Sequence, residues 1–421
     1  MPIAIDQTEN QSRMKKLRIA WAAAVMVGAV SPAAGQVQIT ADVLTTGRYR
    51  TPYSISSRNT VGSAANPDNR SGVLWHHPAI WTNFSSDDVE FLPIPELHVG
   101  EARATTENYV AGYVASVDGE STVATLWVGE DREVVQLNPQ GMPKAVVLAA
   151  TDEEQGGFVG SATAFQLFDI RTSSKDRPSG GFVSVQSAIR EPTTRSPALT
   201  PRAAIWRGSA ETYVDVHPAD FSESMIIDTD GTNQVGYVAE GETKFAAVWS
   251  GSSSSFQNLH PEDADESTAL STDDGLAVGF ARYSETCDRQ PVLWHLDEER
   301  AERLQYPDDS FIFGEATDVL GDIIVGYGFT SDSRRHALLW LDDGQTVINL
   351  DKVLPSSGYT GSSAVAISRA GDSYLIAGSA TLSWRIAPAV WTVTVPEPQT
   401  FSLAFVVFAL GGRSRRAIDS K

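Results

Sequence analysis

The stretch GDIIVGYGFTSDSRRHALLW, residues 321–340, contains the pattern that decides the fold. It reads as a β-branched apolar strand, a polar turn and a second strand that ends in tryptophan. The ending, Ala or Pro followed by two residues and Trp, occurs seven times, at residues 78–81, 124–127, 203–206, 246–249, 291–294, 337–340 and 388–391. A strand pair repeated in this way predicts a repeat protein made of small β-sheets.

The spacing of the tryptophans gives the size of the unit. Successive tryptophans lie 46, 79, 43, 45, 46 and 51 residues apart. The interval of 79 is close to twice 40, which predicts a unit that has lost its tryptophan, with AFQLF at 164–168 as the best substitute. A glycine strand precedes several tryptophans by 13 to 15 residues, at Gly112, Gly236, Gly279, Gly326 and Gly378.

A period of 40–50 residues with about four short strands per unit is typical of a β-propeller blade. We therefore predict an all-β fold, a β-propeller of seven blades of about four antiparallel strands. Six or eight blades are alternatives, because residues 156–200 hold two weak glycine-strand candidates at 157–160 and 181–183. A β-solenoid is the rival architecture. The predicted propeller spans residues 73–395 and follows an N-terminal segment, 36–72.

The order of a Val-Gly-Tyr strand, an Ala-x-x-Trp strand and a later Leu resembles the HAF-type repeats of secreted bacterial proteins. The resemblance covers roughly 78–395 and is cleanest over 203–350. It implies a propeller-like extracellular protein, with no activity attached to the repeat itself.

The N-terminus has the layout of an export signal. Basic MKKLR, an apolar run of 12 residues (IAWAAAVMVGAV) and small-residue SPAAG follow one another over residues 14–35. This order predicts a secretory signal peptide over 1–35, cleaved near Gly35. The polar residues 1–13 read as an upstream start-site artefact. An amphipathic or core helix is the alternative.

The C-terminus combines a short motif, an apolar run and a basic cluster. These are Val395, Pro396, Glu397 and Pro398, then residues 401–412, then Arg413, Arg415 and Arg416. The order resembles the PEP-CTERM sorting tail of exported bacterial proteins, here over 396–421. The resemblance implies an exosortase-like membrane enzyme as processing partner, and a cell-envelope or extracellular location. Residues 395–412 give the length of a thin, transient transmembrane anchor; a simple C-terminal strand is the alternative.

Composition narrows the classes of function. Hydrophobic residues make up 42% of the 421 residues, which supports a packed core. The net charge of −21 argues against a nucleic-acid partner, because binding phosphates needs a basic face. Cys287 is the lone cysteine, so the chain forms no internal disulfide.

Two histidines, in HPAD at 217–220 and HPED at 260–263, suggest a metal or acid–base set. Each histidine, however, follows its tryptophan by 11 residues, and Asn138 and Asp351 occupy the same position in other units. A residue type that recurs at one repeat position indicates a turn or cap rather than a ligand. His76 and His77 are adjacent, so on a strand they point to opposite faces, which favours packing of a closure strand.

Two acidic stretches are candidate sites. Residues 228–233 (DTDGTN) faintly resemble a calcium loop but lack its downstream Glu, and they fit a hairpin turn. Residues 152–154 (DEE) could form an acid–base pair, although neighbouring carboxylates usually mark a solvated edge. The sequence therefore assigns no catalytic residue, no metal ligand and no cofactor. Calcium binding stays an expectation without a defined site.

We predict a non-enzymatic exported propeller that binds a glycan or protein partner, such as extracellular polysaccharide or a matrix protein. The candidate binding surface holds Trp75 and Trp384, together with the Pro/Ser/Thr-rich stretch 171–202, because these depart from the repeat. The alternatives are a secreted hydrolase or lyase acting on extracellular polysaccharide and a purely structural matrix protein.

Overall fold

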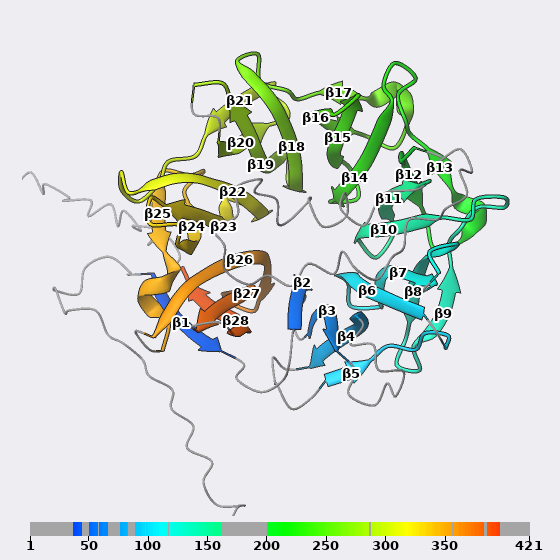
Figure 1. Cartoon of the computed structure of the whole chain (residues 1–421), viewed down its shortest axis with the longest axis horizontal. Helices are drawn as coiled ribbons and strands as arrows, with labels where there is room; N and C mark the ends of the chain where they lie inside the picture. The colour runs from blue at the N-terminus through cyan, green and yellow to red at the C-terminus, as the bar shows by residue number, and fades with distance from the viewer. Residues whose placement is uncertain are drawn as a thin grey trace, which may run out of the picture.

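The computed structural model shows a seven-bladed β-propeller, which confirms the predicted fold and blade number (Figure 1). Seven four-stranded antiparallel sheets stand around a central channel. The described residues are 37–43, 50–57, 59–65, 76–82, 89–96, 98–116, 118–160, 200–285, 288–355, 358–382 and 385–395. The predicted signal peptide, the tail beyond Val395, Trp75 and Trp384 lie outside them. Within the described ranges no helix is long and apolar enough to cross a bilayer.

Each blade runs from an innermost first strand to an outermost fourth strand. Blades 1 to 3 consist of β2 (Arg50–Ile55), β3 (Asn59–Ala65), β4 (His76–Thr82) and β5 (Val89–Phe91); β6 (His98–Thr105), β7 (Tyr109–Ser116), β8 (Thr122–Val128) and β9 (Glu133–Gln136); and β10 (Ala145–Ala150), β11 (Gln155–Val159), β12 (Arg202–Trp206) and β13 (Val214–Asp215). Blades 4 to 6 consist of β14 (Glu223–Thr229), β15 (Gln234–Glu240), β16 (Thr243–Trp249) and β17 (Gln257–Asn258); β18 (Ala264–Asp273), β19 (Leu276–Tyr283), β20 (Arg289–His295) and β21 (Arg300–Arg303); and β22 (Phe311–Leu320), β23 (Ile323–Thr330), β24 (Arg335–Leu341) and β25 (Thr346–Asn349).

Blade 7 is built from both ends of the described chain. Its first three strands are β26 (Tyr359–Ala370), β27 (Ser373–Leu382) and β28 (Arg385–Thr394), and its outermost strand is β1 (Gln38–Val43). β1 pairs antiparallel with β28, from Gln38 opposite Thr394 to Val43 opposite Ala389. This pairing closes the ring.

The predicted boundary at residue 73 is therefore wrong. The segment 36–72 supplies β1, β2 and β3 to the propeller instead of preceding it. The repeat pattern marks the strands that carry Trp and Gly, and it has no mark for a closure strand.

The prediction of a unit without tryptophan between Trp127 and Trp206 is also wrong. β11 pairs directly with β12, with Phe158 opposite Ala203, so the two tryptophans belong to consecutive blades. The candidate at 157–160 is the glycine strand of blade 3. Residues 161–199, which include the substitutes at 164–168 and 181–183, lie between β11 and β12 in the sequence and outside the described residues.

The repeated tryptophans form the contacts between blades. All seven sit in third strands and are at most 2% exposed. Several indole N–H groups donate to a carbonyl oxygen just after the fourth strand of the preceding blade. The bonds are Trp127 to Pro93 (2.9 Å), Trp294 to Leu259 (2.8 Å), Trp340 to Gln305 (2.7 Å) and Trp391 to Leu350 (3.3 Å). Each bond ties one blade to the blade before it.

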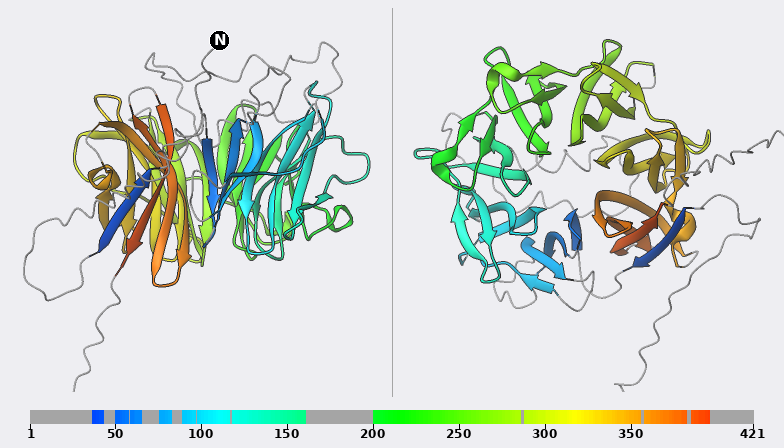
Figure 2. Two further views of the ribbon diagram at one scale, coloured as in Figure 1. Left: turned by 90° about the horizontal axis from the view of Figure 1, so that it is seen from below. Right: turned by 180° about the vertical axis from the view of Figure 1, so that it is seen from behind.

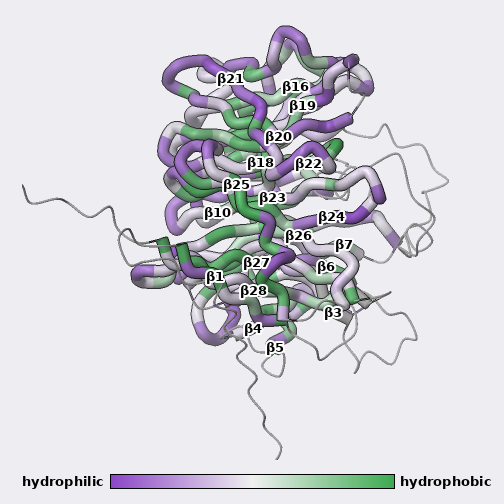
Figure 3. The backbone as a smooth tube through the Cα atoms, turned by 90° about the vertical axis from the view of Figure 1, so that its left-hand side faces the viewer, coloured by the Kyte–Doolittle hydropathy of each residue, from purple (hydrophilic) through white to green (hydrophobic). Residues whose placement is uncertain are grey.

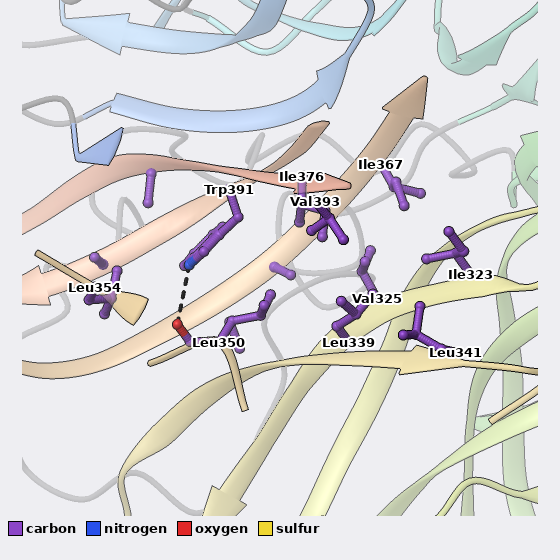
Figure 4. Close-up of a cluster of buried hydrophobic side chains, with 14 residues drawn as sticks. Ile323, Val325, Leu339, Leu341, Leu350, Leu354, Ile367, Ile376, Trp391 and Val393 are labelled. Carbon is purple, nitrogen blue, oxygen red and sulfur yellow. Dashed lines mark hydrogen bonds between the residues drawn. The ribbon is translucent and has the colours of Figure 1, made fainter. Parts of the chain in front are cut away.

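The core between blades 6 and 7 shows this packing in detail (Figure 4). Trp391 of β28 lies among Leu350, Leu354 and Leu339, and the dashed line marks its bond to the Leu350 carbonyl. Among the residues that the structure describes, the hydrophobic ones follow the strands, whereas hydrophilic ones gather in the turns (Figure 3). The core is thus a ring of interblade layers.

The glycine of each second strand allows the blade sheet to form. Gly236 lies opposite Ile226, where the first strand carries a β-bulge before Asp228. A Cβ on Gly236 would overlap the carbonyl oxygen of Met225. Gly112, Gly157, Gly279, Gly326 and Gly378 have the same kind of neighbour in their own blades. The glycine is thus required by the bulge rather than by a turn.

We expect Gly236→Ala to lower the free energy of unfolding by roughly 3 kcal/mol, because a backbone oxygen has no room to retreat. Gly241→Ala is the control: its φ of +61° is left-handed but its Cβ would meet open space, so about 1 kcal/mol should be lost. Urea unfolding of both variants measures the difference. Equal losses would contradict the proposed role of the bulge.

Two matched tryptophans test the interblade bond. Trp340 donates to Gln305, whereas Nε1 of buried Trp206 has no hydrogen-bond partner among the described residues. Phe substitutions remove the same volume at both sites, so Trp340→Phe should cost about 1 kcal/mol more than Trp206→Phe. Thermal and urea unfolding would measure this. Equal losses at the two sites would show that the removed volume alone decides the effect.

Candidate functional site in the central channel

The first strands of the seven blades surround the central channel (Figure 1). A cavity of about 70 Å³ in this channel is lined by residues from six blades. That volume has room for about five water molecules. The polar lining residues are Tyr53, Ser54, Arg103, Asp228 and Asp318, and the others are alanines and one leucine.

The bulge of each first strand decides which residues line the cavity. A register shift places one extra residue in every first strand, and the residue after the shift occupies an equivalent position in each blade. From blade 1 to blade 7 these residues are Ser54, Ala104, Ala149, Asp228, Ser271, Asp318 and Ala366. Small side chains leave space in the channel, and the two aspartates supply its negative charge.

Asp228, Ser271 and Asp318 form an arc across blades 4, 5 and 6, which we call the channel arc. Ser271 Oγ lies 2.7 Å from Asp228 Oδ2 and 2.6 Å from Asp318 Oδ1. Asp228 Oδ2 also accepts the Thr272 N–H at 3.1 Å, and Asp318 Oδ2 accepts the Ile367 N–H at 2.7 Å. The two carboxylates are thus held on either side of a single hydroxyl group.

The environment of Asp228 favours its protonated form. Burial and the nearby Asp318 carboxylate raise the pKa of Asp228 from its ordinary value to about 7, against the opposing effect of its hydrogen bonds to Ser271 and Thr272. Asp228 therefore takes up a proton at a higher pH than an exposed aspartate does.

Another part of the cavity lining carries a positive charge. Arg103 is 7% exposed and pairs with Glu101 at 2.6 Å, and its guanidinium carbon lies 4.1 Å from the centre of the Tyr53 ring. The Tyr53 hydroxyl donates to Glu101 at 3.2 Å. Burial raises the pKa of Tyr53 well above its ordinary value, so the phenol stays neutral. The cavity therefore presents both signs of charge.

The histidines after the outer strands have structural roles. His217 Nδ1 lies 2.7 Å from Ser224 Oγ, which accepts the Ala203 N–H, and His260 Nδ1 lies 2.8 Å from Ser267 Oγ. Burial lowers the pKa of both imidazoles, so they are neutral near pH 7. At the same position Asn138 accepts the Ala124 N–H, and Asp351 bonds His336 and Ser362. These residues tie successive strands together and lie apart from the cavity lining.

The hairpin over 228–233 is a turn, with its acidic residues pointing to different partners. Asp230 Oδ1 accepts the N–H groups of Thr232 and Asn233, both at 2.7 Å. Thr229 donates to Glu154 at 3.0 Å, whereas Asp228 belongs to the channel arc. The described residues contain no cluster of three or more His, Cys, Asp or Glu arranged to hold a metal ion.

Residues 152–154 do not form an acid–base pair. Asp152 and Glu153 are exposed, but Glu154 is 2% exposed and pairs with Arg207 at 3.0 Å. Glu154 also accepts from Gln234 at 2.8 Å. It connects blades 3 and 4.

The predicted site residues that can be placed do not converge. His77 lies in β4, with its ring 6.1 Å from that of Phe91, so it packs within blade 1 and not on the closure strand. Trp75 and Trp384, the predicted binding residues, fall outside the described residues. Ser271 and Asp318 were missed from the sequence. A repeat alignment could have found them, because in blades 1 to 6 the equivalent residue lies eight positions before the glycine of the following strand. These residues are Ser54, Ala104, Ala149, Asp228, Ser271 and Asp318.

No family model matches the chain, and no curated protein sequence matches it. Among solved structures, the propeller is similar to a prolyl endopeptidase, with a TM-score of 0.52, 10% identity, and coverage of 86% of this chain and 50% of that chain. It is also similar to puromycin hydrolase, with a TM-score of 0.48, 10% identity, and coverage of 80% of this chain and 50% of that chain. A third similar structure is an oligogalacturonate lyase in complex with manganese, with a TM-score of 0.48, 10% identity, and coverage of 85% of this chain and 91% of that chain. The chain spans about half the length of the first two. At this identity the likeness shows the β-propeller fold alone.

The raised pKa of Asp228 predicts how stability depends on pH. The folded protein holds this proton more tightly than the unfolded chain, so ionisation of Asp228 makes stability fall as the pH rises from about 4 to about 7. Asp228→Asn should remove that loss and gain on the order of 1–4 kcal/mol over wild type between pH 4 and pH 8. Urea unfolding across this range measures it. Asp230→Asn, a substitution in the adjacent turn, should follow wild type; a parallel pH profile for Asp228→Asn would contradict the assignment.

Proposed function

We propose that this chain is an exported binding propeller of the cell envelope or extracellular matrix, which recognises a glycan in its central channel. The observation that carries the proposal is the cavity, to which six blades contribute and which holds charges of both signs. Cavities with a few convergent polar groups are the usual binding sites of a rigid scaffold. The predicted signal peptide over 1–35 and the resemblance of residues 396–421 to a PEP-CTERM tail, which implies an exosortase-like enzyme as processing partner, support export.

The topology of the blades supports a binding face at one edge of the ring. The strands run between two edges (Figure 2, left). Because the blades share one strand order, the ends of β3, β11 and β27 lie at the same edge. Trp75, residues 161–199 and Trp384 each follow one of these strand ends in the sequence. The described strand ends that lead into these segments therefore lie at one edge of the ring, and we assign the polymeric ligand to that edge.

Co-sedimentation of the purified full chain with extracellular polysaccharide from the producing cells tests this proposal. We expect saturable retention, with and without calcium, and a loss of at least fivefold in affinity for the double variant Asp228→Asn, Asp318→Asn. Asp230→Asn is the matched control and should bind as wild type. Absence of retention in both buffers would overturn the glycan-binding function.

A second candidate, a hydrolase or lyase acting on the same polysaccharide, is favoured by one observation. Asp228, whose pKa is raised, lies across the Ser271 hydroxyl from the Asp318 carboxylate, and two carboxyl groups in different environments are the chemistry of an acid–base pair. The binding function is preferred because both aspartates occupy equivalent repeat positions, and the histidines 217 and 260 serve the outer strands. New reducing ends or unsaturated products that disappear in Asp228→Asn would establish the enzyme instead.

A further inference from the structure

Arg335, the first residue of β24, is a partly buried cation for which the fold supplies no counterion. Its guanidinium carbon lies 5.5 Å from the centre of the Tyr327 ring, and its side chain makes no hydrogen bond or ion pair with another described residue. Asp351, which acts on it electrostatically, is held by His336 at 2.8 Å. Burial lowers the pKa of Arg335 from its ordinary value, because the charged group has lost water without gaining a partner. An anion that binds here would restore what burial removes.

The equivalent arginine of blade 5 shows which group is missing. Arg289 and Arg335 each lie opposite the third residue after the second-strand glycine of their blade. The Arg289 guanidinium lies 3.9 Å from the centre of the Phe280 ring and pairs with Glu315 of the next blade at 2.7 Å. In blade 7 the position of Glu315, opposite the residue that follows the second-strand glycine, is taken by Ser363. A neutral hydroxyl group thus stands where the counterion of Arg335 would be.

An aromatic surface lies beside this arginine. Phe313, Phe329 and Arg335 are opposite one another across β22, β23 and β24. The two phenylalanine rings stack, with centroids 4.3 Å apart and planes 16° apart, and both side chains stay partly exposed. The facing strand of blade 7 carries a glycine here, since a Cβ on Gly361 would lie 3.0 Å from the backbone oxygen of Arg335. We call Phe313, Phe329 and Arg335 the rim site.

The rim site lies at the edge of the ring to which we assign the polymeric ligand. β23 is the second strand of blade 6, so Phe329, near its end, lies at the same edge as the ends of β3, β11 and β27. The site is therefore on the face that a bound polysaccharide would cover.

We propose that the rim site binds a uronic-acid residue of a polysaccharide, with the carboxylate on Arg335 and a C–H face of the sugar ring on the two phenylalanines. A guanidinium presents a planar fork of donors that matches the two oxygens of a carboxylate. Partly exposed aromatic rings offer a flat apolar surface to the C–H face of a sugar. This inference rests on the proposed glycan-binding function and names a subsite and a ligand class for it.

The net charge of −21 limits the kind of polysaccharide that fits. It repels a polymer with an acid on every residue, whereas a mainly neutral chain with occasional uronates brings one carboxylate to one local cation. An acidic peptide fits less well, because its carboxylate sits on a flexible stem that must be immobilised and that has no ring to cover the phenylalanines.

A saturation-transfer NMR titration of the full chain with methyl β-glucuronide and with methyl β-glucoside, in 0.15 M salt to screen distant charges, tests the proposal. The two ligands share the ring and differ in the carboxylate. We expect the glucuronide to bind about tenfold more tightly, because its pair with Arg335 is charge-assisted. Arg335→Gln should remove this preference and leave glucoside binding unchanged. Arg334→Gln is the matched control: Arg334 is exposed and paired with Asp332 at 3.1 Å, so this variant should bind as wild type.

A second variant supplies the missing counterion. Ser363→Glu places a carboxylate at the position that Glu315 occupies in blade 6, where it should pair with Arg335 and weaken glucuronide binding by about tenfold. Circular dichroism of each variant confirms folding, and Arg335→Gln gives the test if Ser363→Glu does not fold.

Several results would overturn the proposal. These are equal affinity for the two ligands, glucuronide binding that is unchanged in Arg335→Gln, or acetate binding as tight as that of glucuronide, which would show an anion site without a sugar surface. If polysaccharide is retained but glucuronide does not bind, only the uronate assignment fails. If neither binds, the proposed function fails with it.

Discussion

The packing of one blade on the next is the interaction on which the structure depends. A four-stranded sheet of this size cannot bury its own faces, so its stability comes from the layer that it shares with each neighbour. The third-strand tryptophan is the largest member of that layer, and in several blades its indole N–H also fixes the distance to the preceding blade. The radius of the channel, and with it the size of the cavity, follows from these seven contacts.

The parts of the fold that could be predicted are those with a local physical cause. Gly236 and its equivalents are required by the facing carbonyl, and Trp249 and its equivalents fill the interblade layer, so both leave a mark in every repeat. The closure strand could not be predicted this way. β1 pairs with a strand that lies 346 to 356 residues further along the chain, and its short alternating sequence resembles many exposed strands. The length added between β11 and β12 likewise looked like a further blade, because spacing alone does not separate the two cases.

The candidate site was hidden for a related reason. Asp228 and Asp318 each look like an ordinary residue beside a hairpin, and the sequence separates them by 90 positions. Only the ring brings them together, since neighbouring first strands face the same axis. The seven blades share one architecture, but the lining of the channel differs from blade to blade. The residue after the bulge of the first strand is aspartate in blades 4 and 6, serine in blades 1 and 5, and alanine in the other three. The raised pKa of Asp228 is a product of this circular arrangement.

The closure of blade 7 also decides how the propeller would carry mechanical load. Val395 directly follows β28, which is hydrogen-bonded on one side to β27 and on the other to β1. A pull applied at this end of the chain would run along a strand held by two ladders. Its backbone bonds would then have to shear together rather than open one at a time. A propeller tethered through its C-terminal end would keep its ring closed under tension, with the channel undistorted.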